Sequence, residues 1–243
     1  MTDLPTSPEG ARQRLADAVR GAISVTVVAD LDGDTMIEAA EAIEAVNRRL
    51  AEAAGPALRA RRPPDIEAAA QEFFPTSPII GQLNPLAPPV RVTVVPGADG
   101  ALPEIAGTAW FDYAYQGPPT CVHGGVIAET FDEVLGAALL AAGSPGMTGT
   151  LSVRYRRPTP LRSDLRLEGR MLRREGRKVF AWGGMFHGDT LTAEAEGVFI
   201  MVPPDQLLAI AEGNIETADD EMVTAIRAEA LRVGAASDVH PGR

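Results

Sequence analysis

The stretch from residue 117 to residue 136, GPPTCVHGGVIAETFDEVLG, constrains the fold most, because it joins a Pro-rich loop to a long apolar helix. The loop ends at His123, and Gly124 and Gly125 follow it. Glycine has no Cβ, so the backbone at these two positions can approach a ligand closely. The apolar pattern predicts a helix from about Gly125 to Ala142, whose unpaired N-terminal N–H groups point back at the loop.

Asp132 follows His123 by nine residues and lies about two turns into this helix. Its apolar neighbours on the helix, all expected to be buried, are Ile127, Ala128, Phe131 and Leu135. These neighbours favour a functional carboxylate over an ordinary surface acid. A set of N–H donors followed by a carboxylate is a candidate site for hydrolysis.

Around the helix, the sequence pattern from Val90 onward is that of strands. Two strands are predicted before it, at residues 90–95 and 107–115, and four after it, at residues 148–159, 164–174, 178–188 and 191–202. Short connections between the last four favour an antiparallel meander. The fold class is therefore α+β, with one long helix and an antiparallel sheet.

The residues on either side of this domain, 90–203, have a different pattern. Residues 1–89 are predicted to form a helical extension, with helices at 11–23 and 65–74 and one between them that carries an apolar stripe from Met36 to Leu50. Thr35 and Glu38 form a capping-box pattern at the start of this second helix, and Gly55-Pro56 stops it. The five prolines between residues 75 and 90 exclude regular structure there. Residues 204–243 are predicted to form a C-terminal tail with weak helices.

Charge argues against nucleic acid or an anionic membrane as the main partner, because the formal net charge is −11. Residues 150–178 differ from this average, since they hold ten cations and three acids, a balance of 10 − 3 = +7. A local basic patch on an acidic chain suits a small polyanionic ligand, and the Arg156–Arg157 pair is its best candidate. The alternative is that these arginines only cover exposed strand faces.

The remaining composition gives expectations about compartment and metals. A single cysteine excludes an intramolecular disulfide, so a reducing cytoplasm is the expected location. The sequence has no signal-peptide pattern at its N-terminus and no apolar run long enough to span a membrane. Three histidines and one cysteine show no metal-ligand spacing, so no metal is expected. Cys121 and His123 are too close in one loop to form a nucleophile–base pair readily.

The combination of motifs resembles the hotdog-fold acyl-CoA thioesterases, in particular the PaaI-like group that includes thioesterase superfamily member four. The matching residues are Gly117-Pro118-Pro119, Val122 to Ala128, Asp132, and the Tyr155-x-Arg157-Pro158-x-Pro160 motif on the next strand. The resemblance covers roughly residues 105–202. It implies a hotdog fold, in which a curved antiparallel sheet wraps the long helix.

The resemblance also implies roles for individual residues. Asp132 would be the general base or nucleophile, the Gly124 N–H would bind the oxyanion, and His123 would orient or polarise this region. Thr148 would position water across a dimer interface. Coenzyme A, which is part of the substrate and not a cofactor, would be bound by Gly125, Arg156, Arg157, Arg177 and Lys178. The expected assembly is a homodimer or a dimer of dimers.

Three alternatives remain beside this interpretation. Glu129 lies one turn before Asp132, so the catalytic acid could be shifted by one turn. A hotdog hydratase is disfavoured, because its usual Asp precedes its His. A non-catalytic acyl-CoA-binding module or regulator is the alternative outside enzymes. Residues 9–90 are hypothesised to restrict the far end of the acyl chain.

Overall fold

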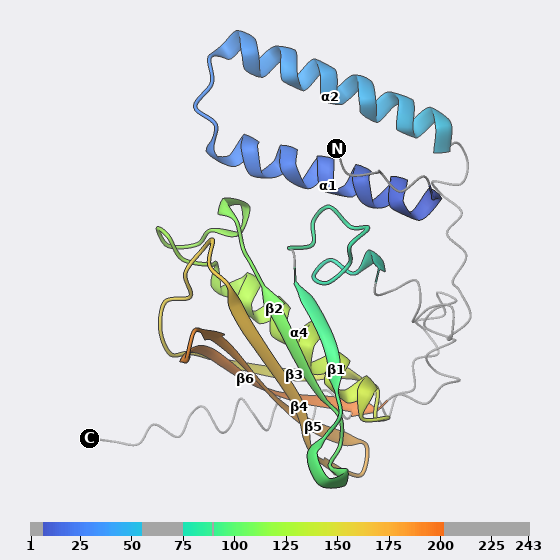
Figure 1. Ribbon diagram of the computed structural model, residues 1–243, viewed down its shortest axis with the longest axis vertical. Helices are drawn as coiled ribbons and strands as arrows, with labels where there is room; N and C mark the ends of the chain where they lie inside the picture. Colours follow the sequence, from blue (N-terminus) through green and yellow to red (C-terminus); the bar gives the residue numbers. More distant parts are fainter. Residues whose placement is uncertain (1–6, 55–74, 89, 202–243) are drawn as a thin grey trace.

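The described part of the chain forms one antiparallel sheet with a long helix on one face and a pair of N-terminal helices beyond it (Figure 1). The computed structural model describes residues 7–54, 75–88 and 90–201 of the 243. The strand order is β1-β2-β4-β5-β6-β3, and every neighbouring pair is antiparallel. The strands are β1 (Arg91–Val95), β2 (Glu104–Ala109), β3 (Gly146–Tyr155), β4 (Leu165–Glu175), β5 (Lys178–His187) and β6 (Thr190–Met201). The predicted α+β class and the hotdog arrangement are confirmed.

Helix α4 (Gly124–Ala141) packs on the sheet through an apolar face that includes Phe131, Leu135 and Leu139. The strands carry glycines at two points where they contact this helix. A Cβ added at Gly169 would lie 2.6 Å from Val134 Cγ1, and one added at Gly183 would lie 3.1 Å from Leu135 Cδ2. The glycines therefore let the helix approach the sheet closely.

The predicted meander of the last four strands is correct for β4, β5 and β6 and wrong for β3. Strand β3 pairs with β6 at the edge of the sheet, and β4 pairs with β2. The connection from residue 156 to residue 164 crosses between them, and the backbone N–H of Leu161 bonds to Thr120 O there. Pro158 and Pro160 have no N–H to donate, so this segment cannot form a hairpin ladder.

The strand predicted at residues 107–115 is also corrected. Strand β2 ends at Ala109, and residues Tyr113–Tyr115 form a short 3-10 helix. The Asp112 side chain accepts a 2.9 Å hydrogen bond from the Tyr113 N–H, which caps this turn. Local capping by Asp112 therefore outweighs the aromatic strand propensity of the segment.

Helix α1 spans Pro8–Val28 and is longer than predicted, whereas α2 spans Gly33–Ala54 and ends directly before the Gly55-Pro56 stop that the sequence predicts. Asp32, not Thr35, caps α2, because its carboxylate accepts hydrogen bonds of 2.8 Å from both the N–H and the hydroxyl of Thr35. These bonds lower the pKa of Asp32. Among the described residues, α2 buries none of its own side chains.

Helix α1 is fixed to the Pro-rich segment at residues 75–88. Arg20 donates from Nε to Ala87 O and from Nη2 to Asn84 O, at 2.9 Å each. The predicted helix at 65–74 and the tail at 204–243 lie outside the described residues. Among the helices that the structure describes, none has the length and apolarity needed to cross a membrane.

Candidate active site

His123 caps the N-terminus of α4. It has extended backbone angles, with φ −62° and ψ 135°, and its Nδ1 accepts a 3.0 Å hydrogen bond from the Gly125 N–H. A side chain at Gly117 would collide with it, since an added Cβ would lie 2.7 Å from His123 Cα. The bond to Gly125 occupies the Nδ1 atom, so His123 does not activate Cys121 through this nitrogen.

Gly124 is held between the helix and the end of β3. The Tyr155 hydroxyl donates a 2.8 Å hydrogen bond to Gly124 O. An added Cβ on Gly124 would lie 3.3 Å from the same hydroxyl oxygen. Within the described residues, the Gly124 N–H has no hydrogen-bond partner. Gly124 therefore has a fixed peptide on its C-terminal side and a free N–H donor on its N-terminal side.

Asp132 is exposed in the single chain. Three of its helix neighbours, Ile127, Phe131 and Leu135, are buried as predicted, and Ala128 is half-buried. Asp132 Oδ1 accepts a 2.7 Å hydrogen bond from Thr148 Oγ1 of the same chain. Thr148 therefore contacts Asp132 within one chain, and its expected role in positioning water across a dimer interface stays a prediction.

A β-bulge at Gly149 explains the position of Thr148. The pairing of β3 with β6 shifts between Thr148 and Thr150, so Gly149 is an extra residue in the ladder. Without it, Thr148 would share the outer face of the sheet with Arg154, whose side chain bonds to Glu196. The bulge turns Thr148 to the helix side, where Asp132 lies.

The second carboxylate near Asp132 is Glu133, which the sequence analysis missed. Burial raises the pKa of Glu133, the charge of Asp132 raises it further, and a hydrogen bond with Ser77 opposes them. Glu129, the acid considered from the sequence, is exposed and makes no hydrogen bond or ion pair with the described residues. Its contacts therefore give no reason to move the catalytic acid from Asp132 to Glu129.

The four basic residues expected to bind CoA do not form one cluster in a single chain. Arg156 and Arg157 lie beside Thr192, since both of their N–H groups bond to Thr192 O. Arg177 lies beside Met201, whose N–H bonds to Arg177 O. Nine residues of β6 separate these points, which corresponds to about 30 Å of extended strand. Lys178 starts β5 next to Arg177, so it belongs to the distant pair.

Arg156 and Arg157 also differ from each other. The Arg156 guanidinium is bound to the Glu194 carboxylate, which lowers the pKa of Glu194. The Arg157 side chain is exposed and has no partner among the described residues. Arg157 is therefore the more available of the two for an anionic ligand.

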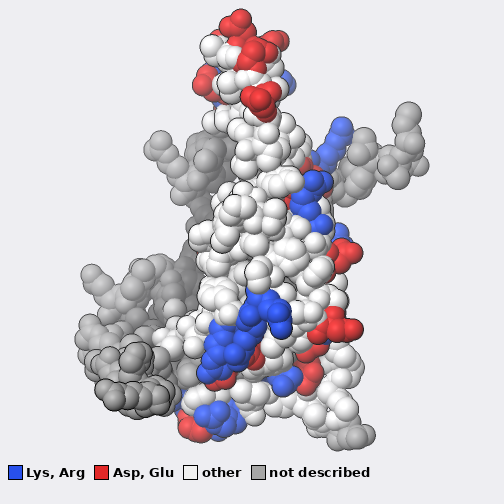
Figure 2. Space-filling view, turned by 90° about the vertical axis from the view of Figure 1, so that its left-hand side faces the viewer, with Lys and Arg blue, Asp and Glu red and all other residues white. Residues whose placement is uncertain are grey.

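Several other arginines of the basic segment stack on aromatic rings of the sheet. The distances from guanidinium carbon to ring centroid are 4.1 Å for Arg166 on Phe186, 4.3 Å for Arg170 on Trp182 and 3.6 Å for Arg173 on Phe180. Figure 2 shows Lys and Arg side chains gathered in the lower half of one face, with Asp and Glu beside them. For these three arginines the simpler interpretation, coverage of an exposed strand face, accounts for the contacts.

No group of three potential metal ligands occurs in the described part of the chain. The candidate groups on one chain are a helix N-terminus with a free N–H, a carboxylate bonded to a hydroxyl, and a free arginine. This set can stabilise an oxyanion and activate a water molecule or attack directly.

Comparison with known proteins gives a consistent result. A family model described as the thioesterase superfamily matches residues 120–194. Bovine acyl-coenzyme A thioesterase THEM4 is 36% identical over 93 residues, which cover 37% of this chain and 38% of the relative. The mouse protein of the same name is 36% identical over 95 residues, which cover 38% of this chain and 41% of the relative. The matched region is thus well under half the length of these curated relatives.

A solved structure extends the similarity further along the chain. The crystal structure of a protein described as a thioesterase superfamily protein is 34% identical, with a TM-score of 0.67. The alignment covers 78% of this chain and 90% of that chain, which is more than residues 90–203 alone can supply. Some residues outside the predicted hotdog domain therefore also align with this protein.

Proposed function

This chain belongs to the thioesterase superfamily, and we propose that it hydrolyses an acyl-CoA thioester to a free acid and CoA. The observation that carries the proposal is the free N–H of Gly124 at the start of α4, next to a peptide fixed by Tyr155 and His123. A thioester carbonyl oxygen placed on this N–H gains negative charge during the reaction. One such donor typically contributes about 3–4 kcal/mol to the transition state, and the helix dipole acts in the same direction.

Asp132 would act as the base or the nucleophile. As a base it takes a proton from water while the water oxygen attacks the thioester carbon. As a nucleophile its carboxylate attacks that carbon, and water then hydrolyses the resulting anhydride. In both routes the C–S bond breaks, and the CoA thiolate takes up a proton. Thr148 would fix the Asp132 carboxylate in either route, through the 2.7 Å hydrogen bond.

One chain alone does not bring these groups together. Gly124 and Asp132 are eight residues apart on α4, so their Cα atoms are separated by about 12 Å along the helix axis. A carbonyl bound at Gly124 is then out of reach of Asp132 in the same chain. In the proposed mechanism the acid is therefore supplied by a second copy.

The free edge of β3 allows a second chain to bind and to supply this acid. Within the part of the chain that the structure describes, β3 pairs only with β6, so its other edge can pair with the same strand of a second chain. In an antiparallel pair centred on the middle of β3, the Thr148 end of one copy lies opposite the Tyr155 end of the other. This arrangement would place Asp132 and Thr148 of one copy near Gly124 and Tyr155 of its partner. We therefore propose a homodimer with shared sites, in which Arg157 contacts the CoA phosphates.

The first test is thiol release from a panel of acyl-CoA substrates by the wild type and by Asp132→Asn. Turnover by the wild type and a loss of at least a hundredfold in the variant are expected. Tight CoA binding without any turnover would instead favour the non-catalytic acyl-CoA-binding module. Turnover by Asp132→Asn at the wild-type rate would reject the role of Asp132.

The second test separates the loss of the Gly124 N–H from the effect of adding a side chain at this position. Gly124→Pro removes the N–H at the first helical position, where proline is tolerated, and the ψ of 135° at His123 suits a residue that precedes proline. Gly124→Ala adds a Cβ but keeps the N–H, so it is the matched control. Gly124→Pro should lose most activity, and Gly124→Ala should lose much less.

The third test examines the sharing of sites. A mixture of Gly124→Pro and Asp132→Asn chains, unfolded and refolded together, forms mixed dimers with one intact site each. Random pairing predicts recovery of about a quarter of wild-type activity from two inactive parents. No recovery, in a mixture shown to contain mixed dimers, would place the whole site within one chain.

A further inference from the structure

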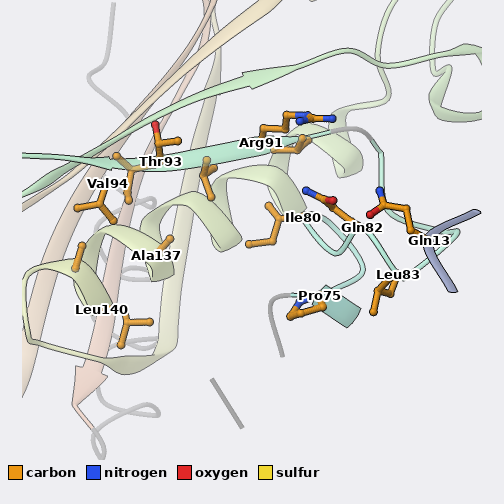
Figure 3. Close-up of a pocket in the computed structure, with 14 residues that line it drawn as sticks. Gln13, Pro75, Ile80, Gln82, Leu83, Arg91, Thr93, Val94, Ala137 and Leu140 are labelled. Atoms are coloured by element: carbon orange, nitrogen blue, oxygen red, sulfur yellow. The ribbon is translucent and has the colours of Figure 1, made fainter. Parts of the chain in front are cut away.

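Helix α2 differs from the other long helices in how little of it is covered. Helix α1 is fixed to the rest of the molecule, since Ala16 is buried and Gln13 lines, with Gln82, a groove of about 690 Å³ between α4 and β1 (Figure 3). Helix α2 lies on the outer side of α1, away from the sheet (Figure 1). It buries none of its side chains in the described part of the chain. Its surface is therefore open to a partner.

One side of α2 carries an apolar stripe with the spacing of a coiled-coil seam. Its members recur at alternating intervals of three and four residues, which keeps them on one side of the helix over several turns. Contiguous exposed apolar surface is typical of an interaction site. The four large side chains are about half exposed: Met36 50%, Ile43 49%, Val46 48% and Leu50 43%. The seam consists of Met36, Ala39, Ile43, Val46, Leu50 and Ala53.

The part of α2 that the chain itself covers lies on the opposite side of the helix. Ala45 is half-buried, and every other residue of α2 is exposed. Each residue advances a helix by about 100°, so Ala45 lies about 160° around the axis from Ile43. The seam therefore points away from the rest of the described chain.

The side chains of the seam complement one another in size when two copies of α2 pair antiparallel. Each outer layer of such a pair combines a large side chain with an alanine, and the middle layer combines two side chains of similar size. A parallel pair would instead place Ala39 on Ala39 and Ala53 on Ala53, and these layers would be underfilled. The antiparallel layers are Met36 with Ala53, Leu50 with Ala39, and Ile43 with Val46.

Charges beside the seam favour the same orientation. Glu38 and Arg49 are eleven residues apart, which is about three turns, so both lie on the same flank of the seam. Within the described residues, neither side chain forms an ion pair. In the antiparallel pair, Glu38 of each copy lies opposite Arg49 of the other copy, at two symmetry-related points. A parallel pair would separate them by about 16 Å along the axis.

We propose that α2 is a self-association surface, which pairs antiparallel with α2 of a second copy of this chain. The contact uses no residue of β3, so it is separate from pairing through the β3 edge and does not depend on thioester hydrolysis. Helix α2 holds two arginines and five acids, a balance of 2 − 5 = −3. An anionic membrane or a nucleic acid is therefore a poor partner for it.

The first test compares two isoleucines of α2 by sedimentation equilibrium. Ile43 lies in the middle of the seam, whereas Ile37, which is 60% exposed, lies about 120° around the helix from Ile43. Ile43→Glu places a carboxylate between the two helices, so the assembly should dissociate at a concentration at least a hundredfold higher than that of the wild type. Ile37→Glu is the matched control and should behave like the wild type. Both variants should fold, because α2 buries none of its side chains in the described chain.

The second test examines the orientation of the pair. Glu38→Arg and Arg49→Glu chains should each self-associate severalfold more weakly than the wild type, because like charges meet at both points. A mixture of the two should prefer mixed pairs, in which opposite charges meet. In a Cys121→Ser background, a short bismaleimide should link Met36→Cys chains to Ala53→Cys chains. It should not link Met36→Cys chains to one another.

Two results would overturn the proposal. If Ile43→Glu chains dissociate at the wild-type concentration, no second copy covers the seam. If the bismaleimide links Met36→Cys chains to one another and not to Ala53→Cys chains, the antiparallel pair is rejected. An absence of thioesterase activity would reject the proposed function but change neither measurement, so the two failures are distinguishable.

Discussion

The hydroxyl of Tyr155, at the end of β3, donates a 2.8 Å hydrogen bond to the carbonyl oxygen of Gly124, at the start of α4. The same peptide unit donates its N–H, that of Gly125, to His123 Nδ1 at 3.0 Å. Both polar ends of this peptide are therefore fixed by side chains. The orientation of the neighbouring Gly124 N–H depends on that fixation, which makes Tyr155 a positioning residue of the proposed site.

Tyr155→Phe keeps the ring and deletes the hydroxyl. A hydrogen bond of this kind contributes about 0.5–1.5 kcal/mol, so kcat should fall about threefold to tenfold. KM should change little, because the substrate does not bond to Tyr155 itself. Tyr115→Phe is the control, since it removes a similar hydroxyl that bonds to Leu86 O outside the site. Equal kinetic effects in both variants would reject a positioning role.

Thr148→Val should reduce kcat about tenfold, because the Asp132 carboxylate loses the hydroxyl that holds it. Thr150→Val is a close control on the same strand. The Thr150 hydroxyl is buried and has no hydrogen-bond partner among the described residues, so its removal should leave activity intact and leave stability unchanged or slightly increased. Steady-state kinetics and thermal unfolding of both variants check this. A loss of activity in Thr150→Val as large as in Thr148→Val would point to a general disturbance of β3.

Arg157→Gln should raise KM for acyl-CoA by about tenfold with little change in kcat, because a charged hydrogen bond to phosphate contributes about 1.5–3 kcal/mol. Arg156→Gln should have a smaller effect, since Glu194 already occupies the Arg156 guanidinium. The KM of the wild type should also rise with salt more steeply than that of Arg157→Gln. If the two variants have the same KM, Arg157 has no special role in CoA binding.

Glu133 makes stability depend on pH. Its pKa is raised in the folded chain, so the folded state binds this proton more tightly than the unfolded state. The free energy of unfolding should then decrease as pH rises from the unfolded-state pKa of about 4.3 through the raised pKa. Glu133→Gln removes this decrease, so its stability relative to wild type should grow between about pH 4 and pH 7. Urea unfolding over this range measures the difference.

Glu129→Gln, an exposed position on the same helix, controls for the simple loss of one negative charge. The free energy of unfolding of Glu133→Gln, compared with that of the wild type, could instead fall or stay constant between about pH 4 and pH 7. Such a result would show that burial does not raise the pKa of Glu133.

Gly169→Ala should destabilise the fold by about 1–3 kcal/mol, because the new Cβ would lie 2.6 Å from Val134 Cγ1 under the helix. Gly136→Ala gives the opposite expectation. A Cβ there meets no atom of the described residues within 4 Å, and alanine should stabilise helix α4 by about 0.5–1 kcal/mol. Denaturant unfolding of both variants tests whether close packing, and not backbone freedom, requires the glycine in β4. A neutral Gly169→Ala would contradict this view of the core.

The sequence alone was sufficient for elements that depend on local patterns. Helix α4 begins at Gly124 and ends at Ala141, within one residue of the prediction, because its apolar residues and its loop boundary are local signals. The alternation on β4 was also predictable, since Leu165 and Leu167 are buried and Arg166 is exposed. The choice of His123, Gly124 and Asp132 rested on their spacing, and their catalytic roles stay predictions.

What the tertiary structure decided concerns residues distant in sequence. The pairing of β3 with β6 instead of β4 depends on where the chain crosses the sheet, and turn length does not encode this. The bulge at Gly149 decided that Thr148 faces Asp132, because one extra residue reverses the face of every position beyond it. The pairing of β3 with β6 also separates Arg156 from Arg177 by most of the length of β6. It places Tyr155, at the end of β3, in contact with Gly124. Local propensity fixes single elements, whereas the positions of these side chains depend on how the elements pair and pack.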